Sequence, residues 1–303
     1  MSKDSGFDGT GNNNKSGNIK RERRQRQQQQ EEEGYKSNPI EIKSPKELDI
    51  LRDCAAIASD VLSKLSRIIA PGLATIEFDE LARREIAALG AEPAFVGYRG
   101  YPSSVCVSIN DELVHGIPSG TRRLKSGDIV SLDLGVRYNG FYGDVAATYP
   151  VGAVPDNAAK IIKAGRDTFE EALIKNSVLK ARVAASGGGG GGVLRLGDIS
   201  SAIEEHIKSR GFSVVRDYVG HGIGRHLHEE PPVPNFGRPS VGPVLKEGMV
   251  LAVEPMLVEG DSAELTLDKD GWTARSASGK LTSHFEHMII IKSGGDFEII
   301  TRW

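Results

Sequence analysis

The sequence holds histidines and carboxylates at spacings that could support metal or acid–base chemistry. The stretch VGHGIGRHLHEEPPVP (219–234) contains three of the seven histidines, His221, His226 and His228, followed directly by Glu229 and Glu230. Imidazole suits both divalent metals and proton transfer near neutral pH. The stretch alone is compatible with a metal site, a catalytic loop or a polar turn between strands, so carboxylates from elsewhere must decide.

Two aspartates are brought close together by a predicted β-hairpin in DIVSLDLGVRYNGFYGDVAATYPVG (128–152). Asn139-Gly140 is the strongest two-residue signal for a hairpin turn. Counting outward from that turn pairs Tyr138 with Phe141, Leu134 with Val145, Gly135 with Asp144, and Asp133 with Ala146. Because paired residues share a face of the sheet, Asp133 and Asp144 are diagonal neighbours on one face. The small residues opposite them should leave room between the carboxylates.

Two like charges on a half-buried sheet repel one another and lose hydration. One carboxyl can stay protonated, both can face bulk water, or a cation can lie between them. Two further carboxylates favour the alternative of a bound cation. Glu254 in MVLAVEPM and Glu286 in SHFEHMIIIK adjoin apolar runs, where a glutamate needs a partner. A buried salt bridge is the alternative for each of these glutamates taken singly. Four carboxylates with one histidine would form a two-metal hydrolytic site.

The elements that must position these residues alternate between helical and strand patterns. Ser44, Pro45 and Glu47 predict the start of a helix through an N-cap, a first-turn proline and a capping box. Further helices are predicted over about 76–89, 156–178 and 198–210, and strands at SVCVSIND, DIVSLDLGV, FSVVRDYV, GMVLAVEPM and SHFEHMIIIK. This order predicts an α+β fold with helices packed on one side of a largely antiparallel sheet.

The composition restricts the class of protein and its surroundings. The chain has 303 residues, a formal net charge of −3 and two cysteines, Cys54 and Cys106. This charge gives no indication of nucleic acid or an anionic membrane as a partner. Two cysteines make no disulfide framework or cysteine zinc cluster, and they indicate a reducing compartment. The apolar runs are shorter than the roughly 18 residues that span a bilayer, and the N-terminus is polar. Both features favour a cytoplasmic location.

A globular domain is predicted at 39–303, with a polar tail before it and a flexible insertion within it. Residues 1–38 are rich in Gly, Asn, Gln and charge, which predicts a disordered polar tail. Its run IKRERRQRQQQQEEE is compatible with a solvated tail or with a weak electrostatic contact to RNA or the ribosome. Six consecutive glycines within about 177–193 predict a flexible insertion between helices. The glycine run is not a phosphate loop, because no Gly-Lys-Ser/Thr follows it.

Several motifs occur in a recognisable order, namely GYRGYPSSVCVSINDELVHGIP, GDIVSLDLGV, GFYGDVAATYPVG, FSVVRDYVGHGIGRHLHEEP, VLAVEPM, DGWTA and FEHMIII. From about residue 40 to Trp303 the chain closely resembles the type I methionine aminopeptidases. The resemblance implies the pita-bread fold, a curved and largely antiparallel sheet with helices on its outer face. It also implies two divalent metal ions, without deciding between Co, Mn, Fe and Zn. The implied metal ligands are Asp133, Asp144, His221, Glu254 and Glu286.

The same resemblance assigns the residues that face the substrate. His115, in VHGIP, should contact the amide nitrogen of the scissile bond, His228 should stabilise the oxyanion, and Glu254 should also accept a proton. His226, Glu229 and Glu230 match no functional position. Leu227 stands where some relatives have a bulkier aromatic residue or methionine, which changes the fit of an apolar pocket. The implied methionine pocket comprises Tyr98, Tyr101, Cys106, Trp272, Phe95 and Leu227.

The resemblance implies removal of the N-terminal methionine from nascent polypeptides, with a preference for a small second residue. The expected protein is a monomer with no membrane or specific nucleic-acid partner, and a ribosome contact is left open. An X-Pro dipeptidase of the same fold usually carries an extra N-terminal domain, which residues 1–38 are too few to form. A non-catalytic binding protein of this fold would have lost metal ligands. A phosphatase or nuclease would need basic residues near the metals.

Overall fold

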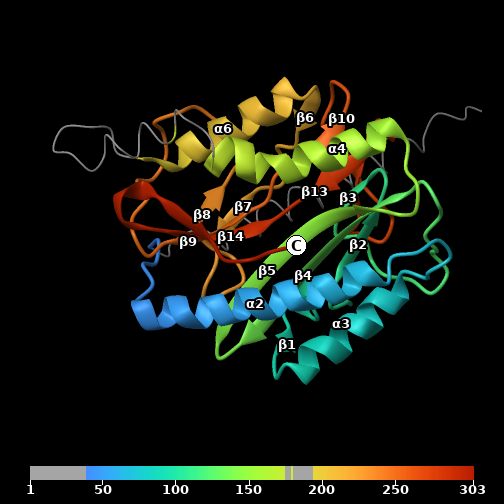
Figure 1. Ribbon diagram of the computed structural model, residues 1–303, viewed down its shortest axis with the longest axis horizontal. Coiled ribbons are helices and arrows are strands. Elements are labelled where there is room, and N and C mark those ends of the chain that lie inside the picture. Colours follow the sequence, from blue (N-terminus) through green and yellow to red (C-terminus); the bar gives the residue numbers. More distant parts are fainter. Residues whose placement is uncertain (1–38, 175–178, 180–193) are drawn as a thin grey trace, which may run out of the picture. The chain divides into compact units, whose positions relative to one another are not determined.

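A long antiparallel hairpin carries the two predicted aspartates in the computed structural model, which describes residues 39–174, 179 and 194–303 (Figure 1). Its strands are β4 (Ile129–Tyr138) and β5 (Phe141–Pro150). The turn residues Asn139 and Gly140 both have positive φ, 50° and 81°, as the predicted turn requires. Asp133 pairs with Ala146, and Gly135 pairs with Asp144. The register predicted from the sequence is therefore confirmed.

The other strands extend this hairpin or form three further sheets, and every strand pairing in the described part of the chain is antiparallel. The hairpin sheet is completed by β1 (Glu92–Pro93) and β2 (Cys106–Ile109), both paired with β4. The five-stranded sheet has the order β15 (Phe297–Ile299), β14 (His287–Ile291), β9 (Val250–Val253), β7 (Gly220–Gly222) and β8 (Glu229–Val233). One three-stranded sheet has the order β13 (Thr282–His284), β10 (Met256–Glu259) and β6 (Phe212–Val214). The other has the order β11 (Leu265–Leu267), β12 (Ala274–Ser276) and β3 (Glu112–Val114).

Helix α2 (Pro45–Arg67) packs against the hairpin strands β4 and β5, and α3 (Ile76–Ala88) packs beside α2. The start of α2 is as predicted, because the Ser44 N–H donates to Glu47 Oε2 at 2.8 Å. The helix lies close to β5 because Gly143 has no side chain. A Cβ at Gly143 would lie 2.7 Å from the backbone of Cys54 on α2. The hairpin therefore has a rigid, closely packed support.

Helices α4 (Asp156–Asp167) and α6 (Leu196–Ser209) lie toward the top of the view in Figure 1, and α2 and α3 lie toward the bottom. The helix predicted over 156–178 differs in winding, because Thr168–Ile174 continues α4 as a π-helix. The helix predicted over 198–210 begins earlier, at Leu196, because the Arg195 N–H donates to Asp198 Oδ2 at 2.8 Å. Two short 3₁₀ turns, Tyr98–Gly100 and Ser293–Gly295, complete the described elements.

The architecture confirms the predicted fold class of helices on a largely antiparallel sheet. A buried apolar cluster joins α2, α3 and α4 to the strands, with members such as Leu62, Phe78, Leu132, Ile161 and Ile289. None of the helices in residues 39–174 and 194–303 is long and apolar enough to cross a membrane. The predicted tail 1–38 lies outside the described residues, as does the predicted insertion 177–193 apart from Leu179. Those two predictions remain predictions.

Candidate metal centre

Three side chains from separate segments converge in the interior of the protein. They are Asp144 on β5, His221 on β7 and Glu286 between β13 and β14, and one donor atom of each lies within 4.8 Å of the others. All three residues are buried. Glu286 is brought beside β5 because its N–H donates to the carbonyl of Ala146 at 2.8 Å. Carboxylate oxygens with an imidazole nitrogen form a donor set suited to borderline divalent ions.

His221 is oriented by its own strand. Its Nδ1 lies 2.9 Å from the carbonyl oxygen of Gly222 and must donate a proton to it, which leaves Nε2 free to bind a metal. Nε2 lies 3.8 Å from Oε1 of Glu254. An added Cβ at Gly220 or Gly222 would lie 2.3 or 2.2 Å from a backbone oxygen of β9 or β8. The alternating glycines of this stretch therefore allow β7 to fit between two strands.

Glu254 follows β9 and lies between two imidazoles. Its Oε1 faces His221, and its Oε2 lies 3.3 Å from Nε2 of His284. Asp133, on β4, lies opposite Cys106 in the strand register, and its charge acts on those of Glu254 and Asp144. The structure thus brings together all five residues that the resemblance names as metal ligands, three of them in the tightest group.

The room predicted between the two aspartates stays a prediction, and the small residues opposite them have close neighbours from other segments. Gly135 makes room for an aromatic ring, because a Cβ there would lie 2.7 Å from Cε1 of Phe95. Ala146 forms a β-bridge with Glu286, which brings the backbone of that segment beside β5. Sequence counting could not reveal these contacts, because Phe95 and Glu286 come from other segments.

The four carboxylates are electrostatically unfavourable in the absence of a cation. Burial raises the pKa of Asp133 to about 7 and that of Glu254 to about 7. Burial, and then the neighbouring negative charges, raise the pKa values of Asp144 and Glu286 well above their ordinary values. Like charges in a region of low hydration disfavour ionisation of one another. A bound divalent cation would reverse this effect by stabilising the ionised carboxylates.

Two observations test whether these residues fit divalent metal ions. Oε1 of Glu286 is buried and has no hydrogen-bond partner. No lysine or arginine of the described segments forms an ion pair with any of the four carboxylates, and only His221 and His284 lie within ion-pair distance of Glu254. Buried carboxylates without a basic partner are the expected ligands of a metal. The residues present therefore fit the divalent ions that the sequence predicts.

Two histidines with predicted substrate roles lie beside the donors. Desolvation by the surrounding protein lowers the pKa of His228 well below its ordinary value, although the residue as a whole is exposed. The ring centroids of His221 and His228 are 4.2 Å apart, and Nδ1 of His228 lies 2.8 Å from the hydroxyl of Tyr98. Burial lowers the pKa of His115 to about 4, and its Nδ1 has no hydrogen-bond partner. Both imidazoles are therefore neutral at pH 7 and can donate or accept a hydrogen bond.

Aromatic side chains line one side of this group. Tyr101 meets Phe95 edge-on at 6.5 Å between ring centroids and meets Trp272 at 5.2 Å. The ring of Trp272 lies 6.3 Å from that of His115. Cys106 is buried beside Tyr101 and Asp133, and burial raises the pKa of its thiol. Four of the six predicted pocket residues thus form one connected wall, and Tyr98 stacks on His228. Leu227 is a buried member of the main apolar core.

The loop that carries His228 is held in place by an ion pair with the segment before α2. Nζ of Lys43 is buried and lies 2.6 Å from Oε2 of Glu229 and 2.6 Å from Oε2 of Glu41. Oε1 of Glu229 accepts a hydrogen bond from the N–H of His226 at 2.9 Å. Glu229 therefore fixes the loop, in agreement with the expectation that it is no metal ligand.

His284 is a residue of this region that the sequence reasoning missed. It is buried at 2% exposure, and burial lowers its pKa, with the charge of Asp133 acting in the opposite direction. A usable signal was present, because residues two apart in an extended segment point to the same face. His284 precedes Glu286 by two positions, so this spacing places the two side chains on the same side.

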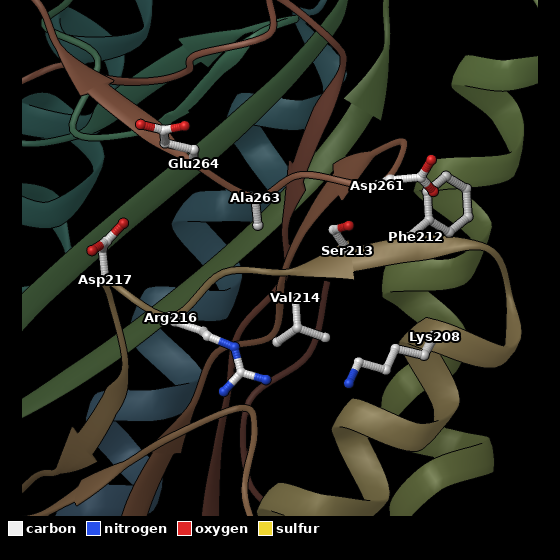
Figure 2. Close-up of a pocket in the computed structure, with 9 residues that line it drawn as sticks. All are labelled: Lys208, Phe212, Ser213, Val214, Arg216, Asp217, Asp261, Ala263 and Glu264. Atoms are coloured by element: carbon white, nitrogen blue, oxygen red, sulfur yellow. The ribbon is translucent and has the colours of Figure 1, made fainter.

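A cavity of about 410 Å³ lies elsewhere, beside β6 and the end of α6 (Figure 2). Its lining includes both cationic and anionic side chains, among them Lys208, Arg216, Asp261 and Glu264. Arg216 is already paired with Glu204 at 2.6 Å and lies over the ring of Phe236. None of the predicted site residues lines this cavity. It is therefore separate from the metal centre.

Comparisons with known proteins place this geometry in a family. Residues 49–293 match the model of metallopeptidase family M24. The chain is 46% identical over 260 residues to methionine aminopeptidase 1 of Bacillus subtilis, covering 86% of this chain and 98% of that protein. It is 44% identical to the methionine aminopeptidase of Clostridium perfringens over 86% of this chain and 98% of that one.

Solved structures give the same result for the fold. A crystal structure of the methionine aminopeptidase of Thermotoga maritima matches with a TM-score of 0.79 at 39% identity, covering 88% of this chain and all of that one. Prolidase from Pyrococcus furiosus shares the fold at a TM-score of 0.64 and 22% identity, covering 86% of this chain and 65% of that one. The chain belongs to metallopeptidase family M24, and within that family to the methionine aminopeptidases.

Proposed function

We propose that this protein removes the N-terminal methionine from polypeptides and that it prefers substrates with a small second residue. The observation that carries the proposal is the buried group of Asp144, His221 and Glu286 beside a wall of aromatic side chains. A hydrolytic metal centre and an apolar pocket for one side chain are the two parts that such a reaction requires.

The proposed ligands of two divalent ions are Asp133, Asp144, His221, Glu254 and Glu286. Divalent ions bound there would supply a water of lowered pKa and a Lewis acid for the scissile carbonyl. Glu254 accepts the proton of the attacking water, a role supported by the raised pKa that burial gives its carboxyl. Mn, Co, Fe and Zn all suit this donor set, and the choice among them depends on availability.

The two neutral imidazoles act on the peptide bond itself. His228 donates a hydrogen bond to the developing oxyanion, supported by the tyrosine hydroxyl 2.8 Å from its Nδ1. His115 contacts the amide nitrogen of the scissile bond. A neutral imidazole can donate from one ring nitrogen and accept at the other, which both assignments require.

The aromatic wall is proposed to receive the methionine side chain. A thioether is flexible and makes favourable contacts with aromatic rings, so it suits a pocket of Tyr98, Tyr101, Phe95 and Trp272 with Cys106 at its base. Leu227 is proposed to complete the pocket. Its smaller side chain changes the fit at that side without adding polarity.

The substrates are proposed to be N-termini of nascent polypeptides, processed by a monomer in the cytoplasm. The basic run within residues 1–38 is proposed to contact the ribosome electrostatically. Deletion of residues 1–38 should then reduce cosedimentation with ribosomes at low salt. Unchanged cosedimentation would remove the proposed contact and leave the enzymatic proposal intact.

The decisive experiment measures release of free methionine from Met-Gly-Met-Met by metal-stripped protein, with and without added Mn²⁺ or Co²⁺. A Met-Lys peptide and an X-Pro dipeptide are assayed in parallel. Metal-dependent cleavage of the first peptide alone is expected. Cleavage of the X-Pro dipeptide would favour a dipeptidase, the activity named for a 22% identical protein that shares the fold. No cleavage by folded, metal-loaded protein would favour a non-catalytic binding protein.

A further inference from the structure

The imidazole of His284 is buried beside the metal centre but is not one of the five proposed ligands. Its residue is 2% exposed, and neither ring nitrogen makes a well-aligned hydrogen bond. Nε2 lies 3.3 Å from Oε2 of Glu254. A buried polar group without a partner is costly, so this ring needs a specific role.

The backbone of His284 is fixed by its neighbours. Its N–H donates to Oγ1 of Thr148 at 2.9 Å, and its carbonyl accepts from the same hydroxyl at 2.9 Å. His284 also pairs with Met256 across strands β13 and β10. Thr148 lies on β5, the strand that carries Asp144. The ring is therefore held in a set position relative to the metal donors by rigid strands.

The two oxygens of Glu254 face different imidazoles. Oε1 lies 3.8 Å from Nε2 of His221, toward the metal donors, whereas Oε2 lies on the His284 side. Glu254 thus presents one carboxylate oxygen to His221 and the other to His284. This arrangement favours a hydrogen bond to the ligand over direct binding of an ion.

We infer that His284 is a positioning residue that holds Oε2 of Glu254 through an Nε2–H donor and leaves Oε1 to bind metal. A carboxylate only accepts hydrogen bonds, so Nε2 must carry the proton. Partners that orient a metal ligand in this way commonly contribute about 10–100-fold to metal affinity. The inference rests on the proposed function only in that Glu254 is a metal ligand.

The test compares Co²⁺ affinity of metal-stripped full-length variants, measured by calorimetric titration, without substrate. His284→Ala should weaken Co²⁺ binding by about 10–100-fold. His284→Gln keeps an N–H donor and should bind Co²⁺ within about three-fold of the unchanged protein. His206→Gln, on α6 and away from the metal donors, is the matched control and should bind normally. Thermal unfolding of the metal-free variants confirms that each is folded.

Two results would overturn the inference. Unchanged Co²⁺ affinity of His284→Ala would mean that Glu254 needs no support. Equal losses in His284→Ala and His284→Gln, with an altered visible spectrum of bound Co²⁺ in both, would make His284 a direct ligand. If His284→Ala does not fold, His284→Asn replaces it, because its shorter amide does not reach Oε2. Methionine release is assayed separately, so unsubstituted protein that binds Co²⁺ but releases no methionine would count against the proposed function alone.

Discussion

His115 shows how a single side chain can serve the reaction without holding a metal. Its backbone has a positive φ of 60°, an uncommon conformation for a residue with a side chain. The ring is directed against Tyr218 and Trp272 at 5.4 and 6.3 Å between centroids. Strained backbone of this kind commonly marks functional positions. The position of His115 beside the aromatic wall therefore agrees with a contact to the substrate.

His115→Ala is expected to lower kcat by about 100-fold or more, the usual contribution of a group acting on the scissile bond. Metal content should stay normal, because His115 is not among the proposed ligands. Methionine release and metal analysis of the same sample provide the measurement. Unchanged turnover would refute the role given to His115, and lost metal would assign it to the metal centre.

At the same scale, the sequence predicted some residues of the site better than others. Asp133 and Asp144 could be placed because a two-residue turn fixes the register of a hairpin by local geometry. Glu286 could be singled out only as a carboxylate beside an apolar run, and His221 was chosen among the loop histidines only through the resemblance. Both reach the hairpin by long-range packing. His284 was missed although its spacing of two from Glu286 places both on one face. Its contact with Glu254, which comes from a different segment, could not be predicted from residue spacing.

The elements contribute through close approaches that glycine permits. Gly143 adjoins Asp144 and lies against the backbone of Cys54 on α2. Any side chain at Gly143 must move either the helix or the strand, because both contacting atoms are main chain. Overpacking of this kind usually costs about 1–3 kcal/mol. The position of a metal ligand therefore depends on the packing of a helix.

Gly143→Ala is expected to destabilise the protein by about 2 kcal/mol and to weaken Co²⁺ binding, because displaced β5 carries Asp144 away from its partners. Gly120→Ala is the matched control, since a Cβ there would meet nothing closer than 3.9 Å. Denaturant unfolding and Co²⁺ titration of both variants test this. Normal stability and affinity of Gly143→Ala would show that the helix and strand can separate freely.

The segment before α2 and the His228 loop also behave as linked elements. Lys43→Met leaves the carboxylate of Glu229 buried at 9% exposure without its closest cation. Removal of one partner from such a pair costs about 3 kcal/mol or more. The expected result is lower stability and a raised KM for methionyl peptides, because the loop carries His228.

The double variant Lys43→Met/Glu229→Gln separates charge from packing. It should recover most of the lost stability, because no buried unpaired charge remains, and the Glu41 carboxylate is 45% exposed to water. Urea unfolding of the single and double variants is the measurement. If the double variant is as unstable as Lys43→Met, the loss arises from packing of the lysine chain instead of the ion pair.

For the whole molecule, metal and protons compete for the same carboxylates. In the metal-free protein, burial raises the pKa of Asp133 to about 7 and that of Glu254 to about 7. Between their ordinary pKa values and pH 7 the folded state holds protons that the unfolded state releases. The stability from these groups is therefore complete at low pH and is lost as pH rises through about 7.

Metal-stripped protein should accordingly melt at a lower temperature at about pH 8 than at about pH 5.5, by about 5 °C. Co²⁺ should remove most of this difference, since metal binding replaces the protons. Scanning calorimetry with and without Co²⁺ measures both effects. In metal-free protein, Asp133→Asn should reduce the change of melting temperature with pH. A metal-free melting temperature that rises with pH would contradict the assignment of these carboxylates to a buried group.

The fold as a whole was predictable to the level of class and of most elements. The capping residues Ser44 and Glu47 set the start of α2, and alternation in the strands gave the antiparallel sheets. The π-helical winding of Thr168–Ile174 was not predictable. The spacing of apolar residues in the sequence indicates a helix but not which backbone groups are hydrogen-bonded. The division into four sheets depends on tertiary packing, which the local periodicity does not encode.

The β-bridge between Ala146 and Glu286 has a consequence for how the protein is made. During synthesis the β4–β5 hairpin can close soon after it leaves the ribosome, since its contacts are local. Its two aspartates then lack His221 and Glu286, which are translated much later. Metal capture must therefore wait for nearly the entire chain. An enzyme proposed to process emerging polypeptides thus acquires its own ions only when its synthesis is almost finished.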